Sequence, residues 1–124
     1  MVSAIGIDTV DIDRIRRDLK RFGDRFLHRI LGDRELDIYR NRADGAVFLA
    51  GRFAGKEAVV KALGRYLVDR PPLQSLQIIN DPTGRPELVL PPDVQEKLRA
   101  AKVLVSISHE RNSAVAMAVI SETE

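Results

Sequence analysis

The sequence contains no cysteine and no tryptophan, and only 5% of its residues are aromatic. The lack of cysteine excludes disulfide bonds and metal sites built from thiolates. The scarcity of aromatic side chains argues against a protein that binds nucleic acid by stacking bases. No apolar run approaches the roughly 20 residues of a membrane span. The N-terminal stretch has no basic region ahead of its apolar residues, so we expect no secretion signal and a cytoplasmic protein.

The remaining composition is typical of a globular protein. Hydrophobic residues make up 44% of the chain and charged residues 31%, and 124 residues suffice for a single domain, 1–124, with its own core. The net charge is only +2, but the segment from Arg14 to Leu31 is strongly basic. Seven of its side chains are Arg or Lys against two aspartates: Arg14, Arg16, Arg17, Lys20, Arg21, Arg25 and Arg29. This segment predicts either an acidic partner or a solvated helix face.

The most informative stretch is FLAGRFAGKEAVVKALG, residues 48–64. Read as a helix, it places large apolar side chains on one stripe and alanines at every fourth residue on a second stripe, which predicts a helix buried between layers. Lys56 falls inside the large stripe, where it either extends to solvent or marks a subunit contact. Glu57 and Lys61 lie between the stripes, either as an i, i+4 ion pair or as part of a site.

The rest of the chain predicts an α+β fold. Apolar alternation predicts strands at residues 2–8, 76–80, 87–90, 103–109 and 114–120, with a turn at 81–84 that makes the second and third a hairpin. Caps and helical spacing predict a helix capped by Thr9, further helices from Asp24, over 34–39 and from Pro91-Pro92, and the central helix from 44 or 45 to about 64. We therefore expect a mostly antiparallel sheet packed on one long central helix, with a frayed tail at 121–124.

Three side chains suggest chemistry. Asp8 ends the first predicted strand, Glu57 lies on the central helix, and His109 ends the strand that contains SISH. Two carboxylates from separate elements suit Mg²⁺, and a nearby lysine suits phosphate. The residues also have structural interpretations, Asp8 as a helix cap and His109 as a turn residue. The run DTVDID lacks the glycine and distal glutamate of an EF-hand loop, so we reject that interpretation.

Four motifs occur in order: GIDTVDIDRI, FLAGRFAGKEAVVKALG, TGRP and SISH. Together, at their separations, they closely resemble the holo-acyl-carrier-protein synthase family of small 4′-phosphopantetheinyl transferases over residues 4–120. The resemblance implies the 4′-phosphopantetheinyl transferase fold. It also implies the transfer of 4′-phosphopantetheine from coenzyme A to a serine of apo-acyl carrier protein. The second product would be adenosine 3′,5′-bisphosphate, and the role would be in fatty acid biosynthesis. It also implies a homotrimer with active sites at subunit interfaces.

The resemblance further implies residue roles. Asp8 and Glu57 match the Mg²⁺ ligands, Lys61 matches the lysine at the phosphate leaving group, and His109 matches the histidine beside the diphosphate. Residues that match those holding coenzyme A are Arg52, Gly64, Gly84, Arg85 and Pro86. Gly64 would let phosphate approach after the helix, whereas Arg52 and the Gly84-Arg85-Pro86 turn would come from the neighbouring subunit. The basic residues that match the carrier-binding helix face are Arg14, Arg25 and Arg29.

Several points stay open at this level. Either Glu57 or a metal-bound water oriented by Asp8 would take the serine proton. The acceptor could instead be a polyketide or peptide synthetase carrier domain. An alternative of another class is a non-enzymatic binder of acidic proteins or nucleic acid, which would leave Asp8, Glu57 and Lys61 without a role. We expect no membrane or nucleic-acid partner.

The sequence departs from the family pattern in three places. The segment GRYLVDRPP places Arg65 and Tyr66 where the family has a glycine-rich phosphate loop, so we expect a bulkier loop. Gly55 replaces a usual alanine at a cost of about 1 kcal/mol within a helix. Ser113 stands where a tyrosine is frequent.

Overall fold

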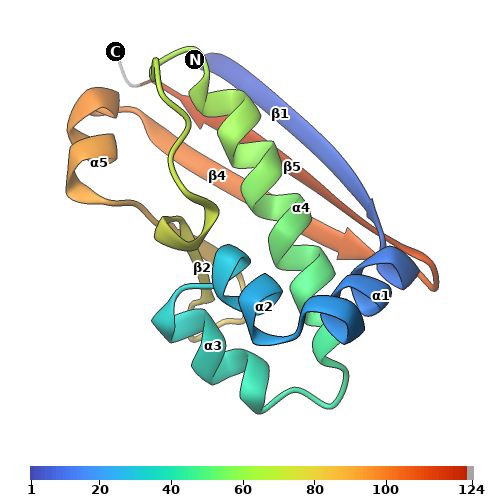
Figure 1. Ribbon diagram of the computed structural model, residues 1–124. Helices are drawn as coiled ribbons and strands as arrows, with labels where there is room; N and C mark the ends of the chain where they lie inside the picture. Colours follow the sequence, from blue (N-terminus) through green and yellow to red (C-terminus); the bar gives the residue numbers. More distant parts are fainter. Residues whose placement is uncertain (123–124) are drawn as a thin grey trace.

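The computed structural model describes residues 1–122, and residues 123–124 lie outside the described part. A three-stranded antiparallel sheet in the order β1–β5–β4 carries the long helix α4 across one face (Figure 1). The bounds are Val2–Asp11 for β1, Lys102–His109 for β4, Ser113–Ser121 for β5 and Gly45–Leu63 for α4. The predicted α+β fold, with an antiparallel sheet on one central helix, is confirmed.

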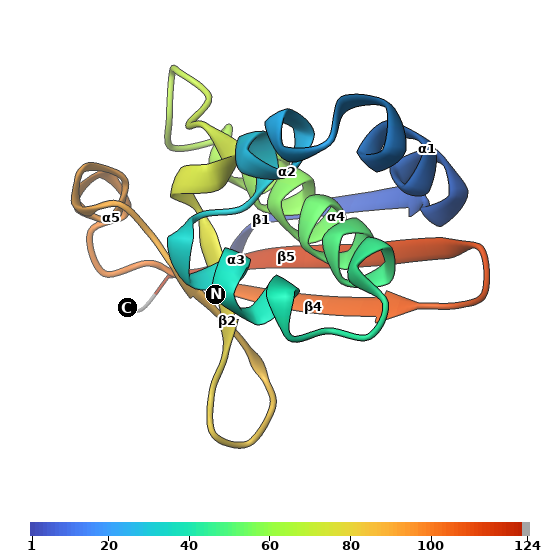
Figure 2. The same cartoon turned by 60° about the horizontal axis from the view of Figure 1, so that its bottom comes forward.

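The other elements surround this sheet and helix. They are α1 (Ile12–Phe22), α2 (Asp24–Ile30), α3 (Asp33–Arg40), the short 3-10 turn η1 (Leu73–Ser75), β2 (Gln77–Asn80), β3 (Pro86–Val89) and α5 (Pro92–Leu98). Strands β2 and β3 form a separate two-stranded sheet, the predicted hairpin. Its loop projects beyond the main sheet (Figure 2) and turns at Gly84, whose φ is 88°. Within residues 1–122 no helix combines the length and the apolar character that crossing a membrane requires.

Small residues bring α4 and the sheet close together. The alanine row of α4 is buried, and the facing residues of β5 are also alanines: Ala114, Ala116 and Ala118. On β1, a Cβ added to Gly6 would lie 2.0 Å from the Ala58 carbonyl oxygen. Only a glycine fits at this crossing, because a helix backbone cannot yield to a methyl group. The close approach fixes β1, and hence Asp8, against the middle of α4.

The opposite face of the sheet is apolar and exposed. Ile5 is 63% exposed, Ile7 56%, Leu104 61% and Met117 46%. On β1 and β5 mostly small residues face α4, and the large apolar side chains of Ile5, Ile7 and Met117 face solvent, the reverse of the usual one-sided sheet. Strand β4 instead turns Val103, Val105 and Ile107 to the core. Exposed apolar surfaces of this kind mark interaction sites.

The structure corrects three boundaries. Strand β1 continues past Asp8 to Asp11, and Asp11 rather than Thr9 caps α1, since its Oδ1 accepts the Asp13 N–H at 3.0 Å. The Thr9 hydroxyl instead donates to the Ala114 carbonyl at 3.3 Å. The tail is ordered further than expected, because Ser121 ends β5 and the Glu122 N–H donates to the Met1 carbonyl at 2.8 Å. Residues 123–124 of the expected frayed tail lie outside the described residues.

Candidate active site

A first cleft of about 330 Å³ lies between β1, α1 and α4. Asp8 and Glu57 both line it, and each side chain is 19% exposed. Asp8 lies opposite Ala116 on β5 and so belongs to the sheet face that α4 covers. The two carboxylates predicted to hold Mg²⁺ therefore meet in one cleft, from different elements. Arg14 of α1 lines the same cleft.

Each of these carboxylates is paired with a cation. Lys61 Nζ donates to Asp8 Oδ1 at 3.0 Å and to the Ile7 carbonyl at 2.8 Å. Arg70, on the loop after α4, forms an ion pair with Glu57. The i, i+4 interpretation of Glu57 with Lys61 is therefore wrong, since each has a different partner.

The donor set of this cleft fits Mg²⁺. Proteins usually hold this ion through one or two carboxylates, and waters and substrate phosphates complete its shell. Asp8 and Glu57 supply that number of carboxylates. Within residues 1–122 no group of three or more His, Asp or Glu side chains gathers in a way that could hold a metal.

A second cleft, of about 670 Å³, lies on the other side of α4. Its lining comes from α4, β4, the loop before α4 and the hairpin, and it includes Arg42, Phe48, Arg52, Asn80, Gly84, Pro86 and His109. Arg42 and Arg52 outnumber the single carboxylate of Asp44 in the lining, so the cleft carries a net positive charge that suits an anionic group such as phosphate.

Arg52 is the most constrained cation of the second cleft. Its Nε donates to the Ile78 carbonyl at 2.9 Å, and Nη2 donates to Asn80 Oδ1 at 3.2 Å. Its guanidinium carbon lies 4.5 Å from the centroid of the Phe48 ring. Burial lowers the pKa of Arg52 to about 10, against the opposing attraction of Glu35, and the charge of Arg42 lowers it further. Arg52 is therefore still charged at neutral pH.

The structure separates the predicted site residues into two groups. Asp8, Glu57, Lys61 and Arg14 lie together around the first cleft. Arg52, Gly84, Pro86 and His109 line the second cleft, so His109 does not meet the carboxylates within this chain.

The remaining predicted residues lie around these clefts. Arg85 lies in a groove between β3 and β4. Gly64 caps the C-terminus of α4 with ordinary helical backbone, φ −56°. Arg29 lines a cleft that adjoins the first one and shares Glu57 and Arg70 with it. Arg25 is exposed on α2. In the loop after α4, the Tyr66 hydroxyl turns to β1 and lies 2.5 Å from Ser3 Oγ.

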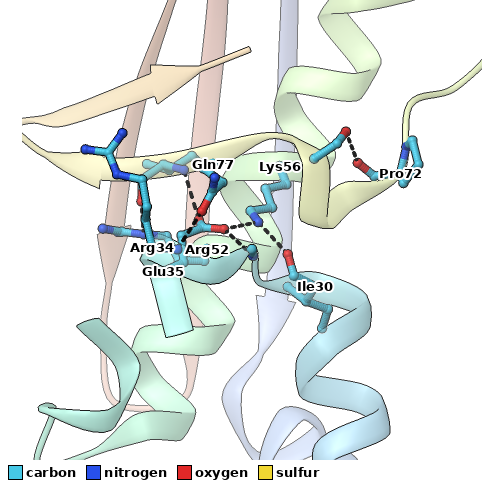
Figure 3. A network of polar contacts seen from close by, with 10 residues as sticks. Ile30, Arg34, Glu35, Arg52, Lys56, Pro72 and Gln77 are labelled. Atoms are coloured by element: carbon cyan, nitrogen blue, oxygen red, sulfur yellow. Dashed lines mark hydrogen bonds and ion pairs between the residues drawn. The ribbon is translucent and has the colours of Figure 1, made fainter. Parts of the chain in front are cut away.

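The structure corrects the interpretation of Lys56 that the sequence suggested. Its side chain is fully buried and therefore neither reaches solvent nor marks a subunit contact. The ammonium donates to the Ile30 carbonyl and forms an ion pair with the buried carboxylate of Glu35, as Figure 3 shows. Burial lowers the pKa of Lys56, and the charge and hydrogen bond of Glu35 oppose that shift.

Sequence reasoning missed several residues of these surroundings. Arg42 and Asn80 line the second cleft, and Arg70 pairs with Glu57. Arg70 is followed by Pro71-Pro72, a pattern that predicts a rigid loop but does not predict a functional role for Arg70. Glu35 stands at the third position of a helix, where an acidic residue is usual for capping. None of these signals distinguishes a site residue from a surface residue.

The fold and the two clefts agree with the comparisons to known proteins. The profile of the 4′-phosphopantetheinyl transferase superfamily matches residues 4–119, and the chain belongs to this superfamily. Within it, the chain belongs to the holo-[acyl-carrier-protein] synthase family. It is 43% identical over 118 residues to the holo-[acyl-carrier-protein] synthase of Chlorobium limicola, an alignment that covers 94% of this chain and 92% of the relative.

Solved structures of the family have the same fold. The crystal structure of the Neisseria meningitidis holo-[acyl-carrier-protein] synthase superposes with a TM-score of 0.89 at 33% identity, and covers 98% of this chain and 100% of that one. The Bacillus anthracis enzyme, solved in complex with CoA (3′,5′-ADP), superposes with a TM-score of 0.82 at 32% identity over 99% of both chains.

Proposed function

We propose that this protein transfers the 4′-phosphopantetheine group of coenzyme A to a serine of apo-acyl carrier protein, and that the resulting holo-carrier supports fatty acid biosynthesis. The serine oxygen forms a bond to the phosphorus next to pantetheine, the bond from that phosphorus to the bridging oxygen breaks, and adenosine 3′,5′-bisphosphate leaves. The observation that carries the proposal is the meeting of Asp8 and Glu57 in one cleft of a chain with this fold.

Residues of the first cleft have defined tasks in this reaction. Lys61 is placed beside Asp8 and provides a positive charge for the phosphate that leaves. Glu57 and a water oriented by Asp8 both remain candidates for accepting the serine proton. When Mg²⁺ is bound by Asp8 and Glu57, it supplies charge that stabilises the diphosphate.

The second cleft binds the nucleotide end of coenzyme A in this proposal. Arg42 and Arg52 provide charge for the 3′-phosphate, and His109 lies beside the diphosphate. We also propose that Arg85 contacts the nucleotide and that Gly64 lets the phosphate approach, as the sequence predicts. Because the two clefts lie on opposite sides of α4, one substrate reaches both most simply when they come from different subunits.

The exposed apolar face of the sheet supports such an assembly. Ile5, Ile7, Leu104 and Met117 would be covered by other copies of the chain. We propose a homotrimer, with the first cleft of one subunit completed by the second cleft of the next.

Arg14 of α1 and Arg25 and Arg29 of α2 are proposed to bind the carrier. Acyl carrier proteins are acidic, so opposite potentials would raise the rate of association and lose effect in salt. Arg14 and Arg29 line the first cleft and its neighbour, where the carrier serine must arrive. Fatty-acid, polyketide and peptide synthetase carriers remain alternatives, and the cytoplasmic location stays a prediction.

The test is a mass measurement on a panel of purified apo-carriers. With Mg²⁺ and coenzyme A, the protein should raise the mass of at least one carrier by a single phosphopantetheine, and the carrier modified fastest identifies the acceptor class. Omitting coenzyme A is the control. If no carrier gains mass, the proposed function is wrong.

A further inference from the structure

A buried polar cluster joins α3, α4 and β2. At its centre is the Glu35 carboxylate, which has no exposed surface. Its Oε1 accepts from Lys56 Nζ and, at 3.0 Å, from the Gly32 N–H, while Oε2 accepts the Ile78 N–H at 2.9 Å. Among residues 1–122, no buried side-chain nitrogen or oxygen lacks a partner. The cluster is therefore a fully satisfied network of the kind that fixes one arrangement of its elements.

The network continues into the second cleft. The Ile78 carbonyl accepts from Arg52 Nε at 2.9 Å, so both polar groups of the Ile78 backbone are bound to it. Arg52 and Lys56 are four residues apart, and both point from α4 toward Glu35 and β2 (Figure 3). A continuous path of hydrogen bonds thus leads from Lys56 through Glu35 and Ile78 to Arg52.

This path anchors the hairpin. Strand β2 pairs only with β3 in the described sheets, and a two-stranded hairpin is marginally stable by itself. The hairpin nevertheless carries Asn80, Gly84 and Pro86, which form one wall of the second cleft. The distance between this wall and Arg52 on α4 therefore depends on how Ile78 is held.

We propose that Glu35 is a positioning residue for coenzyme A, acting through Ile78 and Arg52 without touching the substrate. It rests on the proposed function of the second cleft. A carboxylate suits this position because its two oxygens can accept the three donors together, and Lys56 supplies the compensating charge. A neutral side chain would leave one or more of these donors unpaired.

The test compares two variants, one that removes Glu35 and its partner and one that changes the adjacent residue Leu36. The double variant Glu35→Leu/Lys56→Met removes both charges together, and such an exchange of a buried pair is often tolerated by the fold. The matched control is Leu36→Ala, which weakens packing of the same helix, since Leu36 is 4% exposed and apolar. Both variants of the full chain are measured well below their unfolding temperatures. The readouts are hydrogen exchange of the amides in residues 77–89 and calorimetric binding of adenosine 3′,5′-bisphosphate with Mg²⁺.

In the double variant we expect exchange in the hairpin to become about tenfold faster and nucleotide affinity to fall about tenfold, the effect of losing the one buried hydrogen bond that holds the hairpin at the Ile78 N–H. The KM for the carrier should change less than about twofold, because the carrier docks on the other side of α4. Leu36→Ala should change neither readout. If the double variant does not fold, Glu35→Gln replaces it, with the same direction of change.

Two results would overturn the proposal. One is unchanged exchange and binding in the variant that lacks the carboxylate. The other is an equal loss in Leu36→Ala, which would make Glu35 a residue of general stability. If the wild-type protein itself fails to bind the nucleotide, the proposed function of the cleft is wrong, and exchange alone then decides whether Glu35 anchors the hairpin.

Discussion

At the scale of single residues, the two carboxylates of the first cleft have exchangeable partners. The side chain of Lys61, which pairs with Asp8, is 54% exposed, and that of Arg70, which pairs with Glu57, is 56% exposed. Ion pairs this exposed contribute little to stability. A divalent cation can therefore take the carboxylate oxygens without unfolding the surroundings. The cleft thus combines two mostly buried carboxylates with two cations whose side chains are more than half exposed.

The first prediction concerns these carboxylates. Asp8→Asn or Glu57→Gln should lower the rate of transfer at least about a hundredfold, because an electrostatic group of the reacting centre is lost. The midpoint of thermal unfolding should change little, since the cation of each lost pair is more than half exposed. Initial rates by mass spectrometry and a thermal melt measure both effects.

The control for this prediction is Asp37→Asn, because the Asp37 side chain is 80% exposed on α3. It should transfer at the wild-type rate. Near-normal transfer by either cleft variant would show that its carboxylate is not a metal ligand.

At the scale of elements, helix α1 borders the first cleft and carries several basic residues, of which Arg14 lines the cleft. Arg14→Glu should raise the KM for the carrier roughly tenfold and leave the KM for coenzyme A almost unchanged, because like charges then meet at the docking face. Steady-state kinetics with each substrate varied in turn measure this. Lys20→Glu is the matched control, an equal change of charge on another side of the same helix. Equal rises in both KM values would argue against α1 as the docking face.

The start of α4 provides a prediction about pH. The Asp44 carboxylate accepts the Val47 N–H at 3.3 Å as a helix cap and binds Arg16 at 2.7 and 3.0 Å. The hydrogen bond with Arg16 lowers the pKa of Asp44 below its usual 3.8. A carboxyl with a lowered pKa stabilises the folded state fully above its unfolded pKa, and this contribution disappears as the pH falls through the folded pKa.

Asp44→Ala should therefore lower the midpoint of thermal unfolding by several degrees at pH 7. The difference in midpoint between the variant and the wild type, called the gap below, should narrow below pH 3.8. Melts across a pH series measure the gap, with Asp37→Ala as the control for an exposed carboxylate. A gap of the same size at pH 7 and at strongly acidic pH would mean that the ionised carboxylate is not the cause.

At the scale of the whole molecule, the sequence predicted the sheet and the central helix, and it singled out Asp8 and Glu57, which line one cleft in the structure. Local periodicity and family motifs carry that information. They did not show that Ile5 and Ile7 face solvent, because alternation separates two faces without telling which one packs. They also missed the partner of Lys56, since Glu35 lies 21 residues away and only the packed fold brings them together. The separation of His109 from Asp8 depends likewise on which side of α4 each strand lies.

Because His109 and Asp8 lie in different clefts, the central claim is an active site shared between two subunits. In the proposed trimer, co-expressing Glu57→Gln with His109→Ala would give mixed assemblies, in which each interface takes the first cleft from one subunit and the second from its neighbour. With equal expression, half of the first clefts and half of the second clefts are intact. If the subunits assemble at random, about a quarter of the interfaces should therefore combine two intact clefts. A mixture of Asp8→Asn with Glu57→Gln is the control, because both substitutions damage the same cleft.

The decisive measurement is the transfer rate of the co-expressed Glu57→Gln and His109→Ala proteins, followed as the gain in carrier mass. We predict a rate of about a quarter of the wild-type rate, well above that of either variant alone, and no recovery in the control mixture. A mixture no more active than its two components would contradict an active site shared between subunits.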